Sequence, residues 1–126
     1  MIAAVNKRYI ITIGIIILLS LAGIIWKLQP PKPIPKALLD AFAKCLTKQN
    51  TVMYGAYWCP HCQAQKKLFG GSFQYVKYVE CTKEIKTCGD KKIEGYPTWI
   101  FKNGERIQGE VAFAKLAQKS TCKEPK

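Results

Sequence analysis

The sequence predicts an α/β domain that follows a single N-terminal membrane-spanning helix. Three features support this prediction: an uncharged apolar run near the N-terminus, alternating helix-type and strand-type segments after residue 36, and two cysteines, Cys59 and Cys62, placed where a strand gives way to a helix. The 126 residues leave room for one domain with its own core. We therefore expect a central mixed sheet flanked by helices over residues 36–126.

The N-terminal segment has the length and composition of a membrane span. No charged residue occurs from Tyr9 to Trp26, and a helix of this length reaches across a hydrocarbon core of about 30 Å. The run does not end in the small-residue pattern of a cleavage site, so residues 9–28 are predicted to be an uncleaved signal anchor rather than a cleaved signal peptide. Residues 1–8 form a short tail, and the proline-rich residues 29–35 predict an extended spacer.

Charge and cysteine content restrict where the domain works. The formal net charge is +12, but the lysines are scattered, with no basic run and no interleaved aromatic residues, so nucleic acid is not a predicted partner. An anionic membrane surface explains such a charge better. Six cysteines in so small a domain are typical of an oxidising compartment. We therefore predict a single-pass membrane protein whose domain is extracytoplasmic: periplasmic, lumenal or external.

The domain divides into alternating elements. Apolar residues recur at helical spacing over residues 36–50, with Cys45 at or near the buried face. Residues 51–56 predict a central buried strand, and residues 59–69 predict a helix that ends at Gly70 and Gly71. A strand over 73–81, a short helix or loop over 82–93, a strand over 96–101, a turn over 102–105, a return strand from 106 and a helix over 111–119 complete the order.

The pair Cys59 and Cys62 is interpreted as a redox-active dithiol. Two cysteines with this spacing can open and close as a disulfide with little backbone motion. A zinc site would need a second ligand pair, and Cys81 and Cys88 are too far apart in sequence for a usual one. Gln63 stands where haem attachment requires a histidine. A structural disulfide or buried free thiols are the remaining alternatives, and we predict no metal and no other cofactor.

Two motifs resemble the thioredoxin fold: Trp58-Cys59-x-x-Cys62, and Gly95-Tyr96-Pro97-Thr98, which matches a loop that carries a cis-proline beside the cysteines. More narrowly, residues 55–62, 65–70, 78–81 and 95–99 resemble the thioredoxin-like domain fused to bacterial and plant vitamin K epoxide reductase homologues. The resemblance spans roughly residues 37–120. It implies a compact thioredoxin fold with Cys59 and Cys62 as catalytic residues, and with Trp58, Tyr96 and cis-Pro97 in contact with protein thiol or disulfide clients. Trp58 and Tyr96 could instead simply pack against the fold.

The same resemblance implies a membrane partner. The multi-helix, quinone-reducing part of those homologues has no counterpart in this sequence. A quinone-linked membrane oxidoreductase resembling vitamin K epoxide reductase is therefore expected as a separate protein that reoxidises this one.

The residues around the cysteines favour thiol oxidation. Cys59 at a helix N-terminus is expected to be stabilised as a thiolate, and Pro60 and His61 are the pair found in DsbA-type oxidases. A stabilised thiolate makes the disulfide a stronger oxidant. Thioredoxin-type reductases carry an aspartate where Met53 stands. His61 could instead be an ordinary exposed histidine, and a thiol reductase, an electron relay such as in cytochrome maturation, or a non-catalytic metal-binding or client-docking module are the alternative functions.

Four further cysteines are interpreted as structural. Cys81 and Cys88 could close a small loop, and Cys45 with Cys122 could tie the first helix of the domain to its C-terminal tail. Four cysteines allow three pairings, so the sequence alone leaves the connectivity open. A role for Cys81 and Cys88 as a shuttle that relays electrons to the main dithiol is the functional alternative.

Overall fold

The computed structural model describes residues 6–28 and 32–126 and separates the chain near Pro33 into two units. The second unit is Ile34–Lys126, and the domain boundaries predicted from the sequence stay predictions. Parts of the predicted tail and of the proline-rich spacer, residues 1–5 and 29–31, lie outside the described residues.

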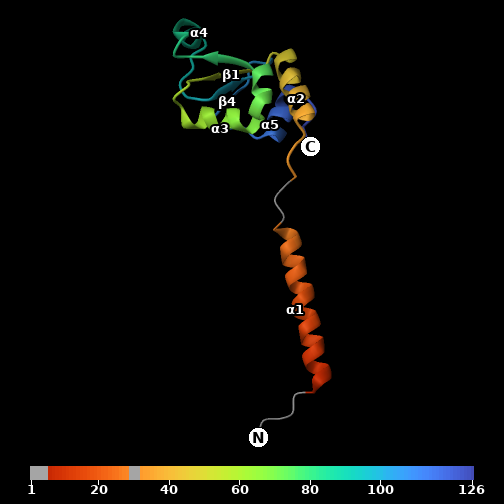
Figure 1. Cartoon of the computed structure of the whole chain (residues 1–126). Helices are drawn as coiled ribbons and strands as arrows, with labels where there is room; N and C mark the ends of the chain where they lie inside the picture. The colour runs from red at the N-terminus through yellow and green to blue at the C-terminus, as the bar shows by residue number, and fades with distance from the viewer. Residues whose placement is uncertain (1–5, 29–31) are drawn as a thin grey trace. The chain divides into compact units, whose positions relative to one another are not determined.

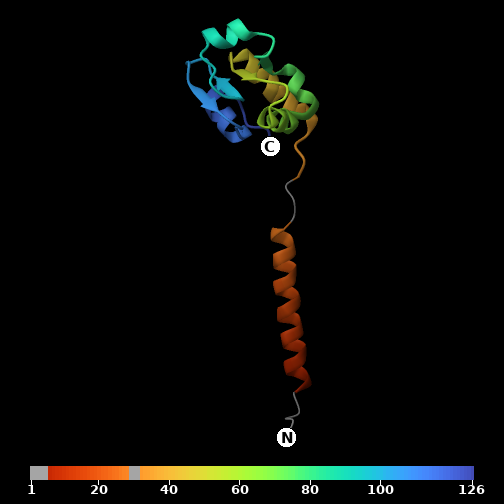
Figure 2. The ribbon, with the colours of Figure 1, turned by 90° about the vertical axis from the view of Figure 1, so that its left-hand side faces the viewer.

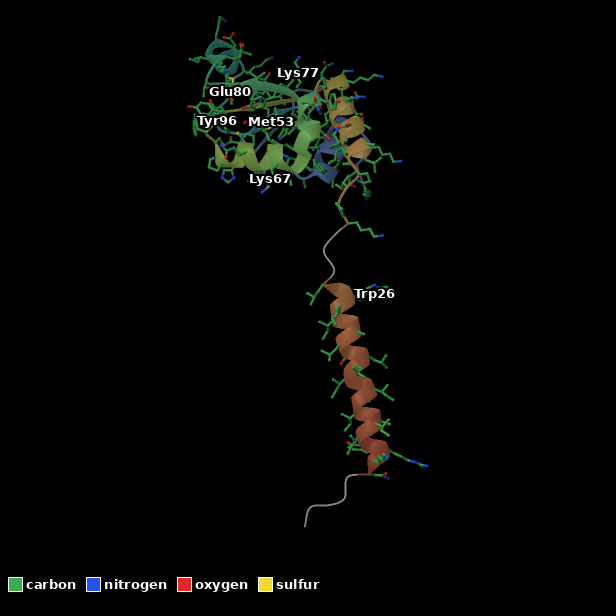
Figure 3. The ribbon with its side chains drawn as sticks, in the orientation of Figure 1. Trp26, Met53, Lys67, Lys77, Glu80 and Tyr96 are labelled. Carbon is green, nitrogen blue, oxygen red and sulfur yellow. A yellow bond between two sulfur atoms is a disulfide. The ribbon has the colours of Figure 1, made fainter. Side chains whose placement is uncertain are left out.

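The first unit consists of helix α1, Lys7–Lys27 (Figure 1). Asn6 caps its start, where the side-chain oxygen accepts a hydrogen bond from the Arg8 N–H. Trp26, labelled in Figure 3, is the last residue of the uncharged run and the penultimate residue of α1, and it is 80% exposed. By length and composition α1 is a candidate membrane span, and a signal sequence near the N-terminus has the same properties.

A four-stranded mixed sheet forms the centre of the second unit. Its strands are β1 (Val52–Gly55), β2 (Lys77–Glu80), β3 (Thr98–Ile100) and β4 (Arg106–Gln108), in the order β2-β1-β3-β4. Strand β1 pairs in parallel with β2 and antiparallel with β3, which in turn pairs antiparallel with β4. The prediction of a mixed sheet with a buried central strand at residues 51–56 is confirmed.

Helices cover the strands on both sides. They are α2 (Lys36–Lys48), α3 (Pro60–Phe69), the 3₁₀ helix η1 (Gly70–Tyr75), α4 (Ile85–Asp90) and α5 (Phe113–Ser120). In both views α3 and α4 lie on opposite sides of the strands (Figures 1 and 2). Apart from η1, the elements follow the predicted order, which agrees with the predicted thioredoxin fold.

The strand alternation divides the core into two clusters. Met53 of β1 and Trp99 of β3 are register partners, and both are fully buried beside α2, α3 and α5. Tyr54, the next residue of β1, points to the other side and packs with Cys81 and Cys88. The larger cluster includes the two free cysteines, Cys59 and Cys62, so the packing that stabilises the domain also fixes their position.

Two predicted boundaries are wrong for identifiable reasons. The strand predicted to begin at residue 73 begins at Lys77, because residues 70–75 coil into η1 and place the Phe73 ring edge-on against Phe69, 6.0 Å between centroids. The last helix begins at Phe113 rather than at residue 111, because the backbone of Val111 is hydrogen-bonded to the Gln65 side chain. In both places a tertiary contact, the packing of the Phe73 ring or the hydrogen bonds of the Gln65 amide, outweighs the preference of the local sequence.

Candidate redox site

Cys59 and Cys62 meet at the point where β1 leads into α3. Cys59 is the N-cap residue of α3, and Pro60 occupies the first helical position, where its missing N–H costs nothing. At the end of β1, Gly55 leaves the space that Cys62 needs, because a Cβ on Gly55 would lie 2.8 Å from the Cys62 Sγ. The helix start and the glycine together hold both sulfur atoms at one end of the sheet.

Hydrogen bonds distinguish the two free thiols. The Cys62 N–H donates to the Cys59 Sγ at 3.4 Å, and the Cys59 thiol donates to the Tyr96 carbonyl oxygen at 3.6 Å. Cys59 is 5% exposed and Cys62 is completely buried. The Tyr96 carbonyl belongs to the Tyr96–Pro97 peptide group, which is cis. Cys59 therefore lies on the side of the pair that an incoming group reaches first.

Burial strongly favours the neutral form of the second thiol. Desolvation raises the pKa of Cys62 to about 11, and its contact with Cys59 acts in the same direction. The backbone hydrogen bond from Ala56 and the positive charge of Lys66 act in the opposite direction and lower the pKa. Cys62 is thus held as a neutral thiol at physiological pH.

A carboxylate and a phenol lie on β2 beside this pair. Tyr78 donates its hydroxyl to Glu80 Oε2 at 2.8 Å, and the Tyr57 N–H donates to Glu80 Oε1 at 3.2 Å. Burial acts to raise the pKa of Glu80, but the hydrogen bonds from Tyr78 and Thr82 outweigh it, so the pKa is lowered. The pKa of Tyr78 is raised, first by desolvation and then by its bond to Glu80. Figure 3 labels Glu80 and Tyr96 at the same end of the domain.

The other predicted site residues occupy the surface around the dithiol. The His61 Nδ1 lies 2.7 Å from Glu110 Oε1, and the imidazole is 71% exposed. Trp58 is 58% exposed and contacts Tyr96 edge-on, with ring centroids 6.1 Å apart. The structure therefore brings Trp58, Tyr96 and Pro97 together beside Cys59. The side chain of His61 instead contacts the carboxylate of Glu110.

The remaining four cysteines are paired. Cys45 is bonded to Cys122, and Cys81 is bonded to Cys88. Cys45 is half-buried and the other three are almost fully buried. Among residues 6–28 and 32–126, no cluster of three or more His, Cys, Asp or Glu side chains has the arrangement of a metal site.

A mixed sheet that presents a free Cys-x-x-Cys pair at a helix N-terminus is the arrangement of a thiol–disulfide oxidoreductase. Residues 36–121 match the thioredoxin family, described as thioredoxin, and the chain belongs to that family. Two of its relatives are named as a thiol-disulfide oxidoreductase and a protein disulfide-isomerase.

Three relatives illustrate the similarity. The chain is 44% identical over 87 residues to the thiol-disulfide oxidoreductase LTO1 of Arabidopsis thaliana, a match that covers 62% of this chain and 23% of the relative. It is 30% identical over 84 residues to a Schizosaccharomyces pombe protein named as a protein disulfide-isomerase, covering 59% and 17%. It is 32% identical over 80 residues to a Drosophila melanogaster thioredoxin domain-containing protein 5 homolog, covering 55% and 19%. The chain thus spans less than a quarter of each relative's length.

Sequence reasoning missed several residues that shape the site. The spacing of Lys66 four residues after Cys62 was an available signal, because residues at this spacing share a helix face. Tyr78 and Glu80 are two residues apart in a strand and therefore lie on the same face of it, which also follows from the sequence once the strand is assigned. The contact between His61 and Glu110 joins residues 49 positions apart and required the fold.

Proposed function

We propose that this protein is a membrane-anchored thiol–disulfide oxidoreductase that oxidises thiols of extracytoplasmic proteins through a Cys59–Cys62 disulfide. The observation that carries the proposal is the difference between the cysteines: four are bonded in pairs, whereas Cys59 and Cys62 are free and linked by a hydrogen bond at the start of α3. A client thiolate attacks the Cys59 Sγ, the Cys59–Cys62 bond breaks, and Cys62 leaves with the electron pair. A second client thiolate then attacks the client sulfur and releases Cys59 as a thiolate.

The oxidase direction is supported by groups that stabilise the reduced pair. The Cys62 N–H faces the Cys59 sulfur at the N-terminus of α3, where the helix dipole favours negative charge. Any stabilisation of the Cys59 thiolate lowers the free energy of the dithiol relative to the disulfide, which makes the disulfide a stronger oxidant. Pro60 starts the helix directly after Cys59 and belongs to the DsbA-type dipeptide, which supports the same direction.

The proposal also includes a surface that contacts client proteins and a position of the domain outside the cytoplasm. Trp58 and Tyr96 offer an aromatic surface beside Cys59, on which an extended client segment can lie. Two disulfides in the domain are typical of an oxidising compartment, so α1 anchors the protein with the domain on the extracytoplasmic side. A quinone-linked membrane protein resembling vitamin K epoxide reductase accepts the electrons and restores the disulfide.

The test is the reduction potential of the Cys59–Cys62 pair in the full-length protein, measured by equilibration with glutathione. A value nearer −120 mV than −270 mV supports the oxidase function, because these are about the potentials of DsbA and thioredoxin. A value near −270 mV overturns the oxidase direction. A Cys62→Ser variant is expected to retain clients as mixed disulfides on Cys59, and a Cys59→Ser variant serves as the control that retains none.

A further inference from the structure

Opening or closing the Cys59–Cys62 bond places negative charge on a buried sulfur atom. Cys62 is completely buried, and desolvation disfavours its thiolate. Met53, at the position of the aspartate found in thioredoxin-type reductases, is an apolar core residue and supplies no charge. The site therefore needs another group that compensates this charge.

Groups from α3, β1, β2 and the loop before β3 lie around the Cys59–Cys62 pair. Helix α3 contributes Cys59 and Lys66, whereas β1 contributes only the backbone of Gly55 and Ala56. Strand β2 contributes Tyr78 and, through its hydroxyl, Glu80. The loop before β3 contributes Tyr96, whose carbonyl is bonded to Cys59 rather than to Cys62. Lys66 is the one cation in this set.

The position of Lys66 is fixed by aromatic rings. It lies four residues after Cys62, on the same face of α3. Its Nζ is 3.7 Å from the centroid of the Tyr78 ring and 5.4 Å from that of Phe73. Both distances are within the range of a cation–π contact, and the side chain is half-buried, which strengthens the attraction.

The Tyr78 ring, in turn, is held beside Cys62. A Cβ on Gly55 would lie 2.8 Å from the Cys62 Sγ and 3.3 Å from the Tyr78 Oη, so the sulfur and the hydroxyl flank the same point of β1. The hydroxyl is fixed by Glu80, which also accepts from the Tyr57 N–H two residues before Cys59. Glu80 therefore ties the ring to the turn between β1 and α3.

We propose that Lys66, positioned by the Tyr78 ring, stabilises the negative charge that develops on Cys62 whenever the Cys59–Cys62 bond breaks or forms. This inference rests on the proposed redox function. When a client thiolate attacks Cys59, the electron pair of the broken bond moves to the Cys62 Sγ, which later takes a proton from solvent. In the reverse direction Cys62 loses that proton and attacks the Cys59 sulfur of the mixed disulfide. The ammonium lowers the free energy of the thiolate in both directions.

Lys67 provides a matched control. It is the next residue of α3, also a lysine, and exposed; Figure 3 shows its label on the side of α3 away from the strands. The variants are Lys66→Met, which removes the charge, Lys66→Arg, which keeps it, and Lys67→Met. Circular dichroism first establishes that each variant retains the wild-type helix content.

The first measurement needs no catalytic activity. In the full-length Cys59→Ser protein in detergent micelles, Cys62 is the only free thiol, and the Cβ chemical shift of isotopically labelled cysteine reports its titration. We expect Lys66→Met to raise the pKa of Cys62, and Lys66→Arg and Lys67→Met to leave it near that of the parent. A Lys66→Met variant with no shift, or an arginine variant that behaves like methionine, overturns the proposal.

The second measurement connects this charge to the reaction. Reduction of the wild-type disulfide by dithiothreitol at pH 7, followed by protein fluorescence, is expected to slow about fivefold in Lys66→Met and to change less than about twofold in Lys67→Met. Equal rates in the two variants overturn the electrostatic role. A wild-type pair that exchanges with no thiol overturns the proposed function instead, while the titration of Cys62 still decides the effect of Lys66.

The positioning part of the inference has its own variants. Tyr78→Phe keeps the ring under Lys66, whereas Tyr78→Leu removes it and frees the ammonium to move into solvent. We expect the leucine variant to raise the pKa of Cys62 in the direction of Lys66→Met, and the phenylalanine variant to raise it less. Equal shifts in both variants would contradict a role of the ring in holding Lys66.

Discussion

The Cys45–Cys122 disulfide joins α2, the first helix of the domain, to the chain that follows α5, the last one. Its removal in a Cys45→Ala/Cys122→Ala variant is expected to destabilise the domain more than the corresponding removal of Cys81–Cys88. The physical reason is the length of chain that each bond closes. The two sequence separations are 77 and 7 residues.

The expected magnitudes follow from the entropy of the unfolded chain. Closing a loop of 77 residues stabilises the folded state by about 4.5 kcal/mol at 25 °C, and closing one of 7 residues by about 2.4 kcal/mol. Domains of this size have a net stability of about 5–15 kcal/mol. Loss of the long-range bond therefore removes a large part of the stability, and loss of the short-range bond leaves a clearly folded domain.

Urea unfolding of the full-length proteins in detergent measures both values. Trp99 is completely buried in the larger cluster, so its fluorescence follows the unfolding of the domain, whereas Trp26 and Trp58 are exposed and contribute a background. Alanine at all four positions makes the two variants comparable in side-chain loss. If the Cys81/Cys88 variant loses as much stability as the Cys45/Cys122 variant, or more, the loop-length reasoning is refuted.

Two further predictions concern single residues. Gln65→Met is expected to lower the free energy of unfolding by about 2–4 kcal/mol, because it leaves the buried N–H and carbonyl of Val111 without partners. The control is Gln63→Met, at an exposed residue of the same helix. Equal losses of stability for the two variants in urea unfolding would contradict this account. Glu80→Gln is expected to lower stability by about 1 kcal/mol at pH 7. The folded-state pKa of Glu80 lies below its unfolded value of about 4.3, so ionised Glu80 stabilises the fold above that pH, and the stabilisation is lost as the pH falls through the folded pKa. The difference between wild type and variant should therefore shrink at pH 3, and a constant difference would refute it.

Most of the fold could be predicted from the sequence because its periodic patterns agree with its packing. The strand over residues 51–56 was identifiable as an apolar run before a turn, and it proved to be the central strand β1. The pattern failed at residues 73–75, which resemble a strand but form η1, since Phe73 packs against Phe69. Such a contact depends on where the two residues meet in space, and no local pattern contains it.

The candidate site, too, could be predicted from the sequence only in part. Cys59 and Cys62 stand out by spacing alone, and the proline before Thr98 marks the loop that lies beside them. The groups that surround Cys62 come from different elements, and their meeting depends on strand register. Glu80 lies at the end of β2 and accepts from the Tyr57 N–H, 23 residues earlier, only because β2 pairs in parallel with β1. Sequence spacing identifies the two candidate thiols, and the sheet determines their surroundings.

The strand register also shows which side chains lie near Cys62 when position 53 carries no carboxylate. Met53 is the register partner of Tyr78, so the side chain that β2 brings opposite the core methionine carries a polar group to the same region. That hydroxyl is bonded to Glu80, and its ring supports Lys66, so an anchored aromatic residue and a cation surround Cys62 where a buried acid is absent. A cation favours the thiolate of Cys62, whereas an ionised carboxylate at position 53 would oppose it; the Glu80 carboxylate is bonded to the far side of the Tyr78 hydroxyl. Under the proposed oxidase function this difference matters, because Cys62 must accept the electron pair each time a client thiolate opens the disulfide.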